Sequence, residues 1–419
     1  MEADPNPAWT RAPWAGVPQP PSAPAPASLR GSLGSSEGAG PSSSLAHGAP
    51  TMPMPPPPPR ASDPSGASRA DPCAPATWRE YFDEARDVAV ASRDPGAGPP
   101  DVFRVYVARA RDASGARASA PPSLVIFCVH GCAYTALSWA PTARHLAARL
   151  GPSAAIVAMD LRGHGESRAA NERDVSAATL ASDVAAVATR VAESRDVFSS
   201  PRGAAAAAAP PRLVLVGHSL GGAIVARVAA GTAVANVAGV VLVDAAESAA
   251  REAIPRMEAT VRRESSSLAR QSRPLGFDAL RDVVEWAVRT RQTLDVASAA
   301  ISYPSQLVPA CDGTEDSATH RWRWRVDLGA TTRFWRGWFE GLTATFLSDA
   351  LRETPKLLVL AGMDRVAEDP EMLVAQMRGA FQTVVIPEAG HACHEDRPAE
   401  VADALASFAE RNSGMRRSK

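Results

Sequence analysis

Short apolar runs recur along the chain from residue 101 onward, and longer stretches with helical spacing separate them. The run at 101–108 alternates between apolar and polar positions, which predicts an early edge strand. The other runs are rich in Val, Ile and Leu, and several are apolar on both faces, as is typical of parallel strands covered by helices. These runs are 124–129, 154–160, 213–216, 237–244, 356–362 and 381–387. The pattern predicts an α/β fold with a mostly parallel sheet flanked by helices.

The spacing of the runs also divides the chain. The interval from 244 to 356 is far longer than one crossover helix needs, and it holds helical patterns and most of the tryptophans. We therefore expect an inserted helical cap at about 248–350. Residues 1–72 are rich in Pro, Ala, Ser and Gly and cannot bury enough apolar surface to offset their ordering entropy. We expect a disordered tail there, a folded domain at 73–419 and a low-complexity insert at 200–211.

Charge and cysteine content narrow the class of protein. The 419 residues carry 44 basic and 45 acidic side chains, a net charge of −1, so neither nucleic acid nor membrane lipid is indicated as a partner. The five cysteines form no C-x-x-C pair, which indicates neither a zinc site nor a disulfide framework. Free thiols suit a reducing compartment, and Glu2 and Asp4 argue against a secretory signal. No apolar run is long enough to span a membrane, so we expect a cytoplasmic or nuclear protein.

The segment Gly217-His218-Ser219-Leu220-Gly221 follows one of the predicted strands and precedes a predicted helix at 223–230. This G-x-S-x-G pattern between a strand and a helix is typical of an elbow that holds a nucleophilic serine in a strained turn. We expect Gly217 and Gly221 to avoid a clash with the serine. An ordinary glycine-rich turn is the alternative, but the flanking elements favour Ser219 as a nucleophile.

A serine hydroxyl needs a base to take its proton. His391 lies directly after the last apolar run, where such a fold places its base, and His394 lies three residues further on. Asp244 and Asp364 each follow a predicted strand and lie between Ser219 and His391 in the chain. The order of residues leaves both aspartates open as the acid that orients the base, and the usual location after the later strand favours Asp364.

The negative charge that develops on an attacked ester needs two backbone donors, an oxyanion hole. The elbow fixes one donor, the N–H of Leu220. The second is expected from the loop after the strand at 124–129, and we assign it to the N–H of Cys132, next to Gly131. His130 is expected to brace this loop, and His218 to point away from the serine.

Several segments together resemble the protein phosphatase methylesterase family of α/β-hydrolases, from about Trp78 to about Phe408. They include "WREYF", "HGCAYTALSWA", "MDLRGHGES", "VGHSLGGAIV", "LVDAAES", "WRVDLGATTRFWRGWFEGLTATFLS" and "QMRGAFQTVVIPEAGHACHED". The elbow and "DLRGHGES" are shared by many hydrolases, whereas "FWRGWFEGL" and "GHACHED" are specific to the family. The oxyanion loop of the family is glycine-rich, and this chain has Cys132, Ala133 and Tyr134 there, which predicts a tighter pocket.

The resemblance implies an α/β-hydrolase fold and a serine esterase. Such an enzyme removes the methyl ester from the C-terminal leucine of the protein phosphatase 2A catalytic subunit, and it needs no metal or organic cofactor. It implies Ser219 as nucleophile, His391 as base and Asp244, rather than Asp364, as acid. This protein phosphatase is then the expected partner.

The aromatic side chains of the predicted cap could either pack the cap onto the core or bind a substrate or partner. Trp335 and Trp338 recur at helical spacing with Phe339, Leu342 and Phe346, which favours packing of the cap onto the core. The two tryptophans are also candidates for substrate binding. Trp322 and Trp324 alternate with arginines in an extended pattern, and an exposed part of this aromatic surface is a candidate docking site for the phosphatase.

Two other functions remain open from the sequence. One is a serine hydrolase of another small or lipid ester, which release of methanol from the methylated phosphatase would distinguish. The other is a non-catalytic module that holds the phosphatase on the same scaffold, which labelling of the active-site serine would distinguish.

Overall fold

The computed structural model describes residues 71–92, 98–111, 121–193, 209–264, 273–310, 320–363 and 369–412. The predicted tail lies outside these residues except for its last two positions, and residues 200–208 of the predicted insert lie outside them too. The tail, the insert and the cap boundaries stay predictions.

The described strands form a sheet of eight and a sheet of three. The larger sheet holds β1 (Glu84–Val90), β2 (Asp101–Arg109), β3 (Leu124–Val129), β4 (Ala154–Met159), β5 (Arg212–His218), β6 (Val237–Val243), β10 (Lys356–Leu360) and β11 (Gln382–Val385). Their order across the sheet is β1-β2-β4-β3-β5-β6-β10-β11. Strands β4, β3, β5, β6, β10 and β11 run parallel to one another, whereas β2 pairs antiparallel with both β1 and β4. The predicted mostly parallel sheet is therefore confirmed.

The expectation of an edge strand at 101–108 is wrong. This segment is β2, and β1 pairs along its whole length on the outer side. The true edge carries exposed Arg86 and Asp87, and Val88 is its one buried hydrophobic residue. A strand that buries a single apolar side chain produces no apolar run, so the sequence pattern did not reveal β1. Charged residues on such an edge also discourage pairing with another chain.

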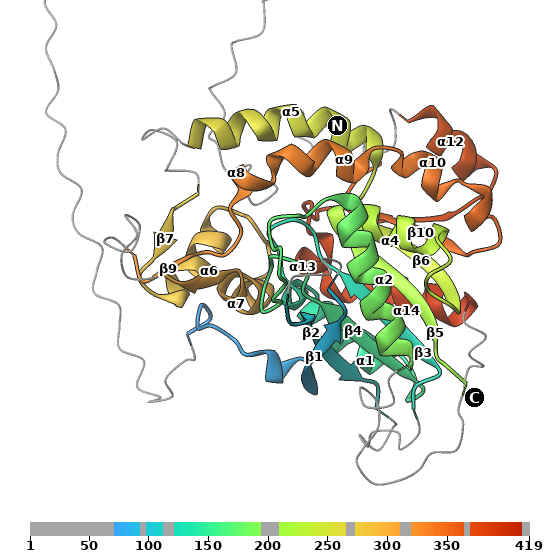
Figure 1. Ribbon diagram of the computed structural model, residues 1–419, viewed down its shortest axis with the longest axis horizontal. Helices are drawn as coiled ribbons and strands as arrows, with labels where there is room; N and C mark the ends of the chain where they lie inside the picture. Colours follow the sequence, from blue (N-terminus) through green and yellow to red (C-terminus); the bar gives the residue numbers. More distant parts are fainter. Residues whose placement is uncertain are drawn as a thin grey trace, which may run out of the picture. The chain divides into compact units, whose positions relative to one another are not determined.

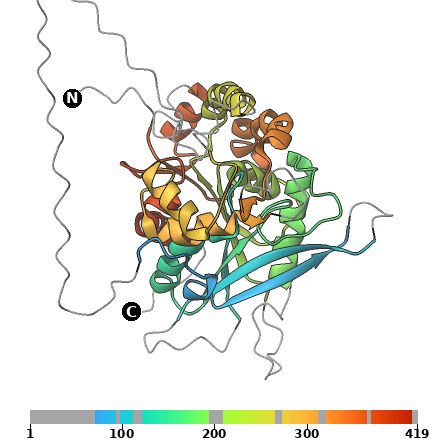
Figure 2. The ribbon, with the colours of Figure 1, turned by 90° about the vertical axis from the view of Figure 1, so that its left-hand side faces the viewer.

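Helices cover both faces of the sheet, as Figures 1 and 2 show. On one face α1 (Ala140–Arg149) packs against α14 (Pro398–Asn412), and on the other α2 (Ala177–Glu193) packs against α4 (Leu220–Ala230). The helix α12 (Pro370–Met377) precedes β11. Every position of β3 and β4 is buried between these layers. The carboxyl ends of the parallel strands therefore project loops from a rigid support.

The long connection between β6 and β10 holds its own small elements. The helices are α5 (Glu247–Glu264), α6 (Leu280–Arg289), α7 (Val296–Ser305), α8 (Leu328–Thr331), α9 (Trp335–Phe339) and α10 (Leu342–Phe346). The sheet of three has the order β7-β9-β8, from β7 (Gly276–Phe277), β9 (Trp322–Trp324) and β8 (Leu307–Pro309). The short helical turns of the described chain are η2 (Trp78–Glu80), η3 (Ala136–Trp139), η6 (Thr332–Phe334), η7 (Asp349–Leu351) and α13 (Cys393–Asp396). In Figure 1, α5, α8 and α9 lie at the end of the sheet where β5 and β6 lead into α4 and α5.

The extended pattern at Trp322 and Trp324 is the strand β9. Its residues are half-buried, and Trp324 makes an edge contact with Phe277, with ring centroids 5.7 Å apart. Arg273 lies over the Trp324 ring, 4.1 Å from its centroid. Much of the predicted aromatic surface is thus covered by the chain itself.

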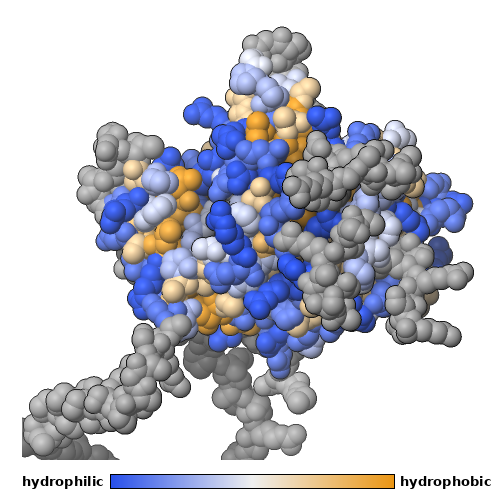
Figure 3. Space-filling view, turned by 90° about the horizontal axis from the view of Figure 1, so that it is seen from below, coloured by the Kyte–Doolittle hydropathy of each residue, from blue (hydrophilic) through white to orange (hydrophobic). Residues whose placement is uncertain are grey.

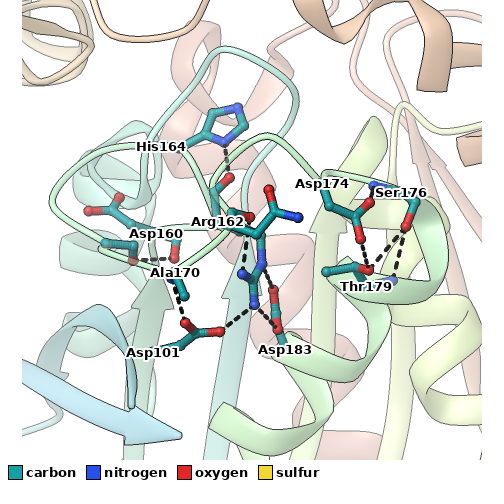
Figure 4. Close-up of polar contacts among 11 residues, drawn as sticks. Asp101, Asp160, Arg162, His164, Ala170, Asp174, Ser176, Thr179 and Asp183 are labelled. Carbon is teal, nitrogen blue, oxygen red and sulfur yellow. Dashed lines mark hydrogen bonds and ion pairs between the residues drawn. The ribbon is translucent and has the colours of Figure 1, made fainter. Parts of the chain in front are cut away.

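A buried ion pair fixes the loop after β4. Arg162 donates to both carboxylate oxygens of Asp183 in α2, at 2.7 and 2.8 Å, and to Asp101 at the start of β2, at 2.7 Å. Figure 4 shows its guanidinium between the two carboxylates. All three side chains are almost fully buried. Removing the cation would leave two carboxylates in the interior without their counter-charge.

The surface seen in Figure 3 is mostly hydrophilic, with small, separate hydrophobic patches. Scattered apolar residues of this kind are normal on a protein surface. Within the described part of the chain, none of the helices has the length and apolar character needed to cross a membrane.

We predict that Arg162→Leu lowers the free energy of unfolding by about 3–5 kcal/mol, because it strands buried Asp101 and Asp183. Chemical denaturation measures the change. The matched control is Arg168→Leu, which breaks an exposed pair with Asp87 at 3.0 Å and should cost less than about 1 kcal/mol. Equal losses in the two variants would contradict the importance of the buried pair.

Candidate active site

Ser219 lies at the sharp turn between β5 and α4. Its φ of 51° and ψ of −117° lie outside the regions that non-glycine residues favour. The backbone N–H of Ser219 donates to the carbonyl of Val243 at 3.0 Å, which ties the turn to β6. The helix begins at Leu220, three residues before the predicted start. The predicted elbow is therefore present, in the strained conformation expected of it.

Gly217 and Gly221 avoid a clash with neighbouring backbone atoms, whereas a clash with the serine was expected. A Cβ at Gly217 would lie 2.2 Å from the carbonyl oxygen of Gly221, and a Cβ at Gly221 would lie 2.3 Å from that of Val129. The obstruction is therefore the backbone of α4 and of β3, and the expectation that the serine itself causes the clash is wrong. The glycines let a helix start within van der Waals contact of two strands.

His391 and Asp244 meet through a direct hydrogen bond. The Nδ1–H of His391 donates to Oδ2 of Asp244 at 2.7 Å, and Oδ1 of Asp244 accepts from the N–H of Ala361 at 3.1 Å. Asp244 has a positive φ of 46°, and its side chain is 1% exposed. Because Nδ1 carries the proton, Nε2 of His391 is the basic nitrogen. Asp364, the other candidate acid, lies outside the described residues.

Ser219, Asp244 and His391 line one pocket, together with Cys132 and Leu220. The rest of its wall is apolar and comes from the loop before α5, from α5 and from α9. These wall residues are Ala246, Ala249, Ala250, Ala253, Ile254, Met257, Trp335, Trp338 and Phe339. The structure thus brings the predicted nucleophile, the two predicted oxyanion-hole residues, His391, Asp244 and the two candidate tryptophans to a single pocket, whereas His394 does not line it.

The loop after β3 approaches the serine closely. A Cβ at Gly131 would lie 3.3 Å from the Cβ of Ser219 and 2.7 Å from Nδ1 of His218. The amide of Tyr134 donates to the carbonyl of Gly131 at 3.2 Å, and the amide of Ala133 donates to Nε2 of His164 at 3.1 Å. The amides of Ala133 and Tyr134 are therefore already hydrogen-bonded, and the residue before them, Cys132, lines the pocket.

The Cys132 thiol is a neutral part of the pocket wall. Burial raises the pKa of this thiol to about 12, although a hydrogen bond with Thr331 offsets part of the effect. A neutral thiol is a weak nucleophile.

Two buried histidines brace this loop. His130 donates through Nδ1 to the carbonyl of Gly131 at 2.7 Å and accepts through Nε2 from the amide of Leu161 at 2.9 Å, as expected of a brace. His164 bonds the carbonyl of Arg162 through Nδ1 at 2.9 Å, as Figure 4 shows. Burial lowers the pKa of His130 well below 6.5 and that of His164 to about 4. Both rings stay neutral, so each keeps one donor and one acceptor nitrogen.

His218 and His394 lie beneath the loop that carries His391. Nε2 of His218 donates to the carbonyl of His391 at 3.0 Å, and the ring of His394 lies 4.5 Å from that of His218 and 4.2 Å from that of Trp139. Burial lowers the pKa of His218 well below 6.5 and that of His394 to about 3. Neither ring lines the pocket. Of these histidines, His391 is the one that lines the pocket.

Trp335 and Trp338 are buried and also line the pocket. The indole N–H of Trp335 donates to the hydroxyl of Thr331 at 3.0 Å, and that of Trp338 to the carbonyl of Val175 at 2.6 Å. Trp338 therefore ties α9 to the segment before α2, Trp335 ties it to α8, and both indoles contribute to the pocket wall.

Comparisons with known proteins identify the family and the fold. Residues 125–404 match the Alpha/beta hydrolase family. The chain is 32% identical over 379 residues to protein phosphatase methylesterase 1 of Mus musculus, covering 82% of this chain and 86% of that protein. It is 34% identical over 352 residues to protein phosphatase methylesterase 1 of Gibberella zeae, covering 83% of this chain and 78% of that protein.

Among solved structures, E-2-(acetamidomethylene)succinate hydrolase superposes with a TM-score of 0.52 at 20% identity, covering 78% of this chain and 100% of that chain. At that identity the likeness shows the fold alone. Together with the family match it confirms the predicted α/β-hydrolase fold.

Sequence reasoning had not singled out Glu395, which is fully buried in α13 next to His394. Burial raises the pKa of this carboxyl well above 4.5, nearby Asp396 and Asp295 raise it further, and the Ser302 hydroxyl offsets part of the shift. An acid with a raised pKa in the folded state contributes stability that is fully present below its unfolded pKa. That contribution is lost as the pH rises through the folded pKa.

We predict that Glu395→Gln, which cannot ionise, gains stability relative to the wild type as the pH rises above about 4.5. Melting temperatures from pH 4 to 9 measure the difference. The control Glu353→Gln alters an exposed carboxyl and should leave the difference flat. A pH-independent offset for Glu395→Gln would show that its carboxyl does not couple folding to pH.

Proposed function

The chain belongs to the protein phosphatase methylesterase family of α/β-hydrolases, and from this premise we propose its substrate and its catalytic residues. It is a carboxylic ester hydrolase that acts on a protein phosphatase. We propose that it removes the methyl ester from the C-terminal leucine of the protein phosphatase 2A catalytic subunit, with Ser219 as nucleophile. The observation that carries the proposal is the 2.7 Å bond between His391 and Asp244 in the pocket that holds Ser219.

In the first half of the reaction, the substrate ester carbonyl lies above Ser219. Nε2 of His391 takes the hydroxyl proton while the oxygen of Ser219 attacks the carbonyl carbon. The tetrahedral oxyanion receives hydrogen bonds from the amides of Leu220 and Cys132. His391 then gives the proton to the methoxide oxygen, and methanol leaves an acyl-enzyme.

In the second half, water repeats the cycle. His391 takes a proton from water, the resulting hydroxide attacks the acyl carbon, and Ser219 leaves with its proton restored. The products are methanol and a free leucine carboxylate. Asp244 keeps the proton of His391 on Nδ1 and stabilises the imidazolium that forms in both halves.

The lining of the pocket supports an uncharged ester as the substrate. The wall from α5 and α9 is apolar, which suits a leucine side chain and a methyl group. The carboxylate product would carry a charge into the same apolar surroundings, where an unpaired charge is costly. This difference favours release of the product.

We propose the cytoplasm or nucleus as the location of the protein. Cys73, Cys128 and Cys132 form no disulfide with another residue of the described chain. Unpaired cysteines suit a reducing compartment, where an intracellular phosphatase would also be found.

We predict that the purified chain demethylates carboxymethylated protein phosphatase 2A, and that Ser219→Ala lowers the rate by several orders of magnitude. Loss of the methyl group and release of methanol measure the reaction. A fluorophosphonate probe should label the wild type and leave the variant unlabelled.

Other outcomes separate the alternatives. Hydrolysis of a short p-nitrophenyl ester without loss of the methyl group would indicate a hydrolase of other small or lipid esters. Binding of the phosphatase without labelling or turnover would indicate a non-catalytic module.

We predict that Asp244→Asn lowers turnover by roughly 10⁴-fold, as loss of the correct histidine tautomer does in other triads. Asp364→Asn is the matched control and should cost much less. Both variants are compared in one demethylation assay, with melting temperatures to verify folding. A folded but inactive Asp364→Asn beside an active Asp244→Asn would reverse the assignment.

A further inference from the structure

We propose that Asp396 is a positioning residue for His391, because its buried carboxylate holds the loop that carries the histidine. The inference rests on the proposed role of His391 as the base. It concerns a residue that touches neither the pocket nor Ser219.

The carboxylate of Asp396 gathers three donors from two segments. Oδ2 accepts from the amide of Gly390 at 2.6 Å, directly before His391 in the chain. Oδ1 accepts from the amide of Leu294 at 2.7 Å and from the hydroxyl of Thr293 at 3.1 Å. Asp396 is 5% exposed, so water competes weakly for these bonds. The carboxylate thus joins the histidine loop to the connection between α6 and α7.

The loop depends on such contacts from outside. It follows the last strand of the sheet, and Glu388 within it has a positive φ of 65°, which is strained for a side chain of its size. The contacts that hold the loop near the histidine include the Nδ1 bond to Asp244, the carbonyl bond to His218 and the Gly390 bond to Asp396. Asp244 and His218 hold His391 itself. Asp396 holds the backbone of Gly390, the residue directly before His391.

A shift of about 1 Å in a catalytic group can cost about 100-fold in rate. Without the Asp396 carboxylate, the amide of Gly390 is released and the backbone before His391 can move. The position of the His391 ring relative to Ser219 then varies, whereas the apolar wall from α5 and α9 is unaffected. The loss should therefore appear in the chemical step rather than in substrate binding.

Neighbouring hydrogen bonds provide a matched control. The hydroxyl of Ser298 donates to the carbonyl of Glu395 at 2.8 Å, and the hydroxyl of Thr142 donates to that of His394 at 2.7 Å. Each is a buried bond to the same turn, α13, yet neither reaches Gly390. Ser298→Ala therefore removes a comparable bond without releasing the histidine loop.

The experiment compares the wild type, Asp396→Ala, Asp396→Asn and Ser298→Ala in the full chain. We measure the second-order rate of labelling by a fluorophosphonate, together with kcat and KM for a short-chain p-nitrophenyl ester, below every melting temperature. We expect Asp396→Ala to lower the labelling rate and kcat by about 10- to 100-fold, with KM changed less than about threefold. Asp396→Asn keeps one acceptor for Gly390 and should fall between Asp396→Ala and the wild type. Ser298→Ala should stay within about threefold of the wild type.

Folded Asp396 variants that react at the wild-type rate would overturn the inference. A loss shared equally by Ser298→Ala would do the same, because it would reflect general destabilisation. If Asp396→Ala does not fold, the labelling rate and kcat of Asp396→Asn are compared with those of Ser298→Ala, and a larger loss in Asp396→Asn supports the inference. A wild type that fails to react with the fluorophosphonate would instead overturn the proposed serine chemistry.

Discussion

The close approach of α4 to strands β3 and β5 is the constraint on which the site depends. Ser219 adopts a strained backbone conformation at the point of contact, at a cost of about 1–3 kcal/mol. The turn persists because its amide bonds β6 and because glycines at 217 and 221 admit the neighbouring backbones. The first amide of α4 has no partner within the helix. The same turn that strains the serine thus places Leu220, the first residue of the helix, in the wall of the pocket.

Burial divides the histidines around Ser219 into two kinds. His130, His164, His218 and His394 are desolvated, and the pKa of each is lowered. Neutral imidazoles of this kind act as rigid connectors between loops. His391 lines the pocket and meets a carboxylate instead. The scaffold therefore places one pocket-lining histidine among four buried histidines whose pKa values are lowered.

Local patterns revealed the elbow and the parallel strands, because a glycine–serine–glycine turn and a buried apolar run each leave a signal in adjacent residues. Other features depend on register between distant segments. The contact of Asp244 with His391 joins β6 to a loop after β11, and only the family resemblance favoured it over Asp364. The strand β7 has two residues, too few to show an alternation of apolar and polar positions. Asp396 lies in a run of charged residues of the kind usually found on a solvent-exposed surface. Those features became visible only once the chain was folded.

The wall that α5 contributes to the pocket has a consequence for how this scaffold diversifies. Ala249, Ala250 and Ala253 each offer the pocket little more than a methyl group. Exchange of any one for a larger apolar residue would narrow the cavity by a small step without touching the elbow, the histidine or the aspartate. The width of the pocket and the proposed catalytic groups are therefore encoded at separate positions. Substitutions in this helix can reshape the cavity for a different ester while Ser219, His391 and Asp244 stay unchanged.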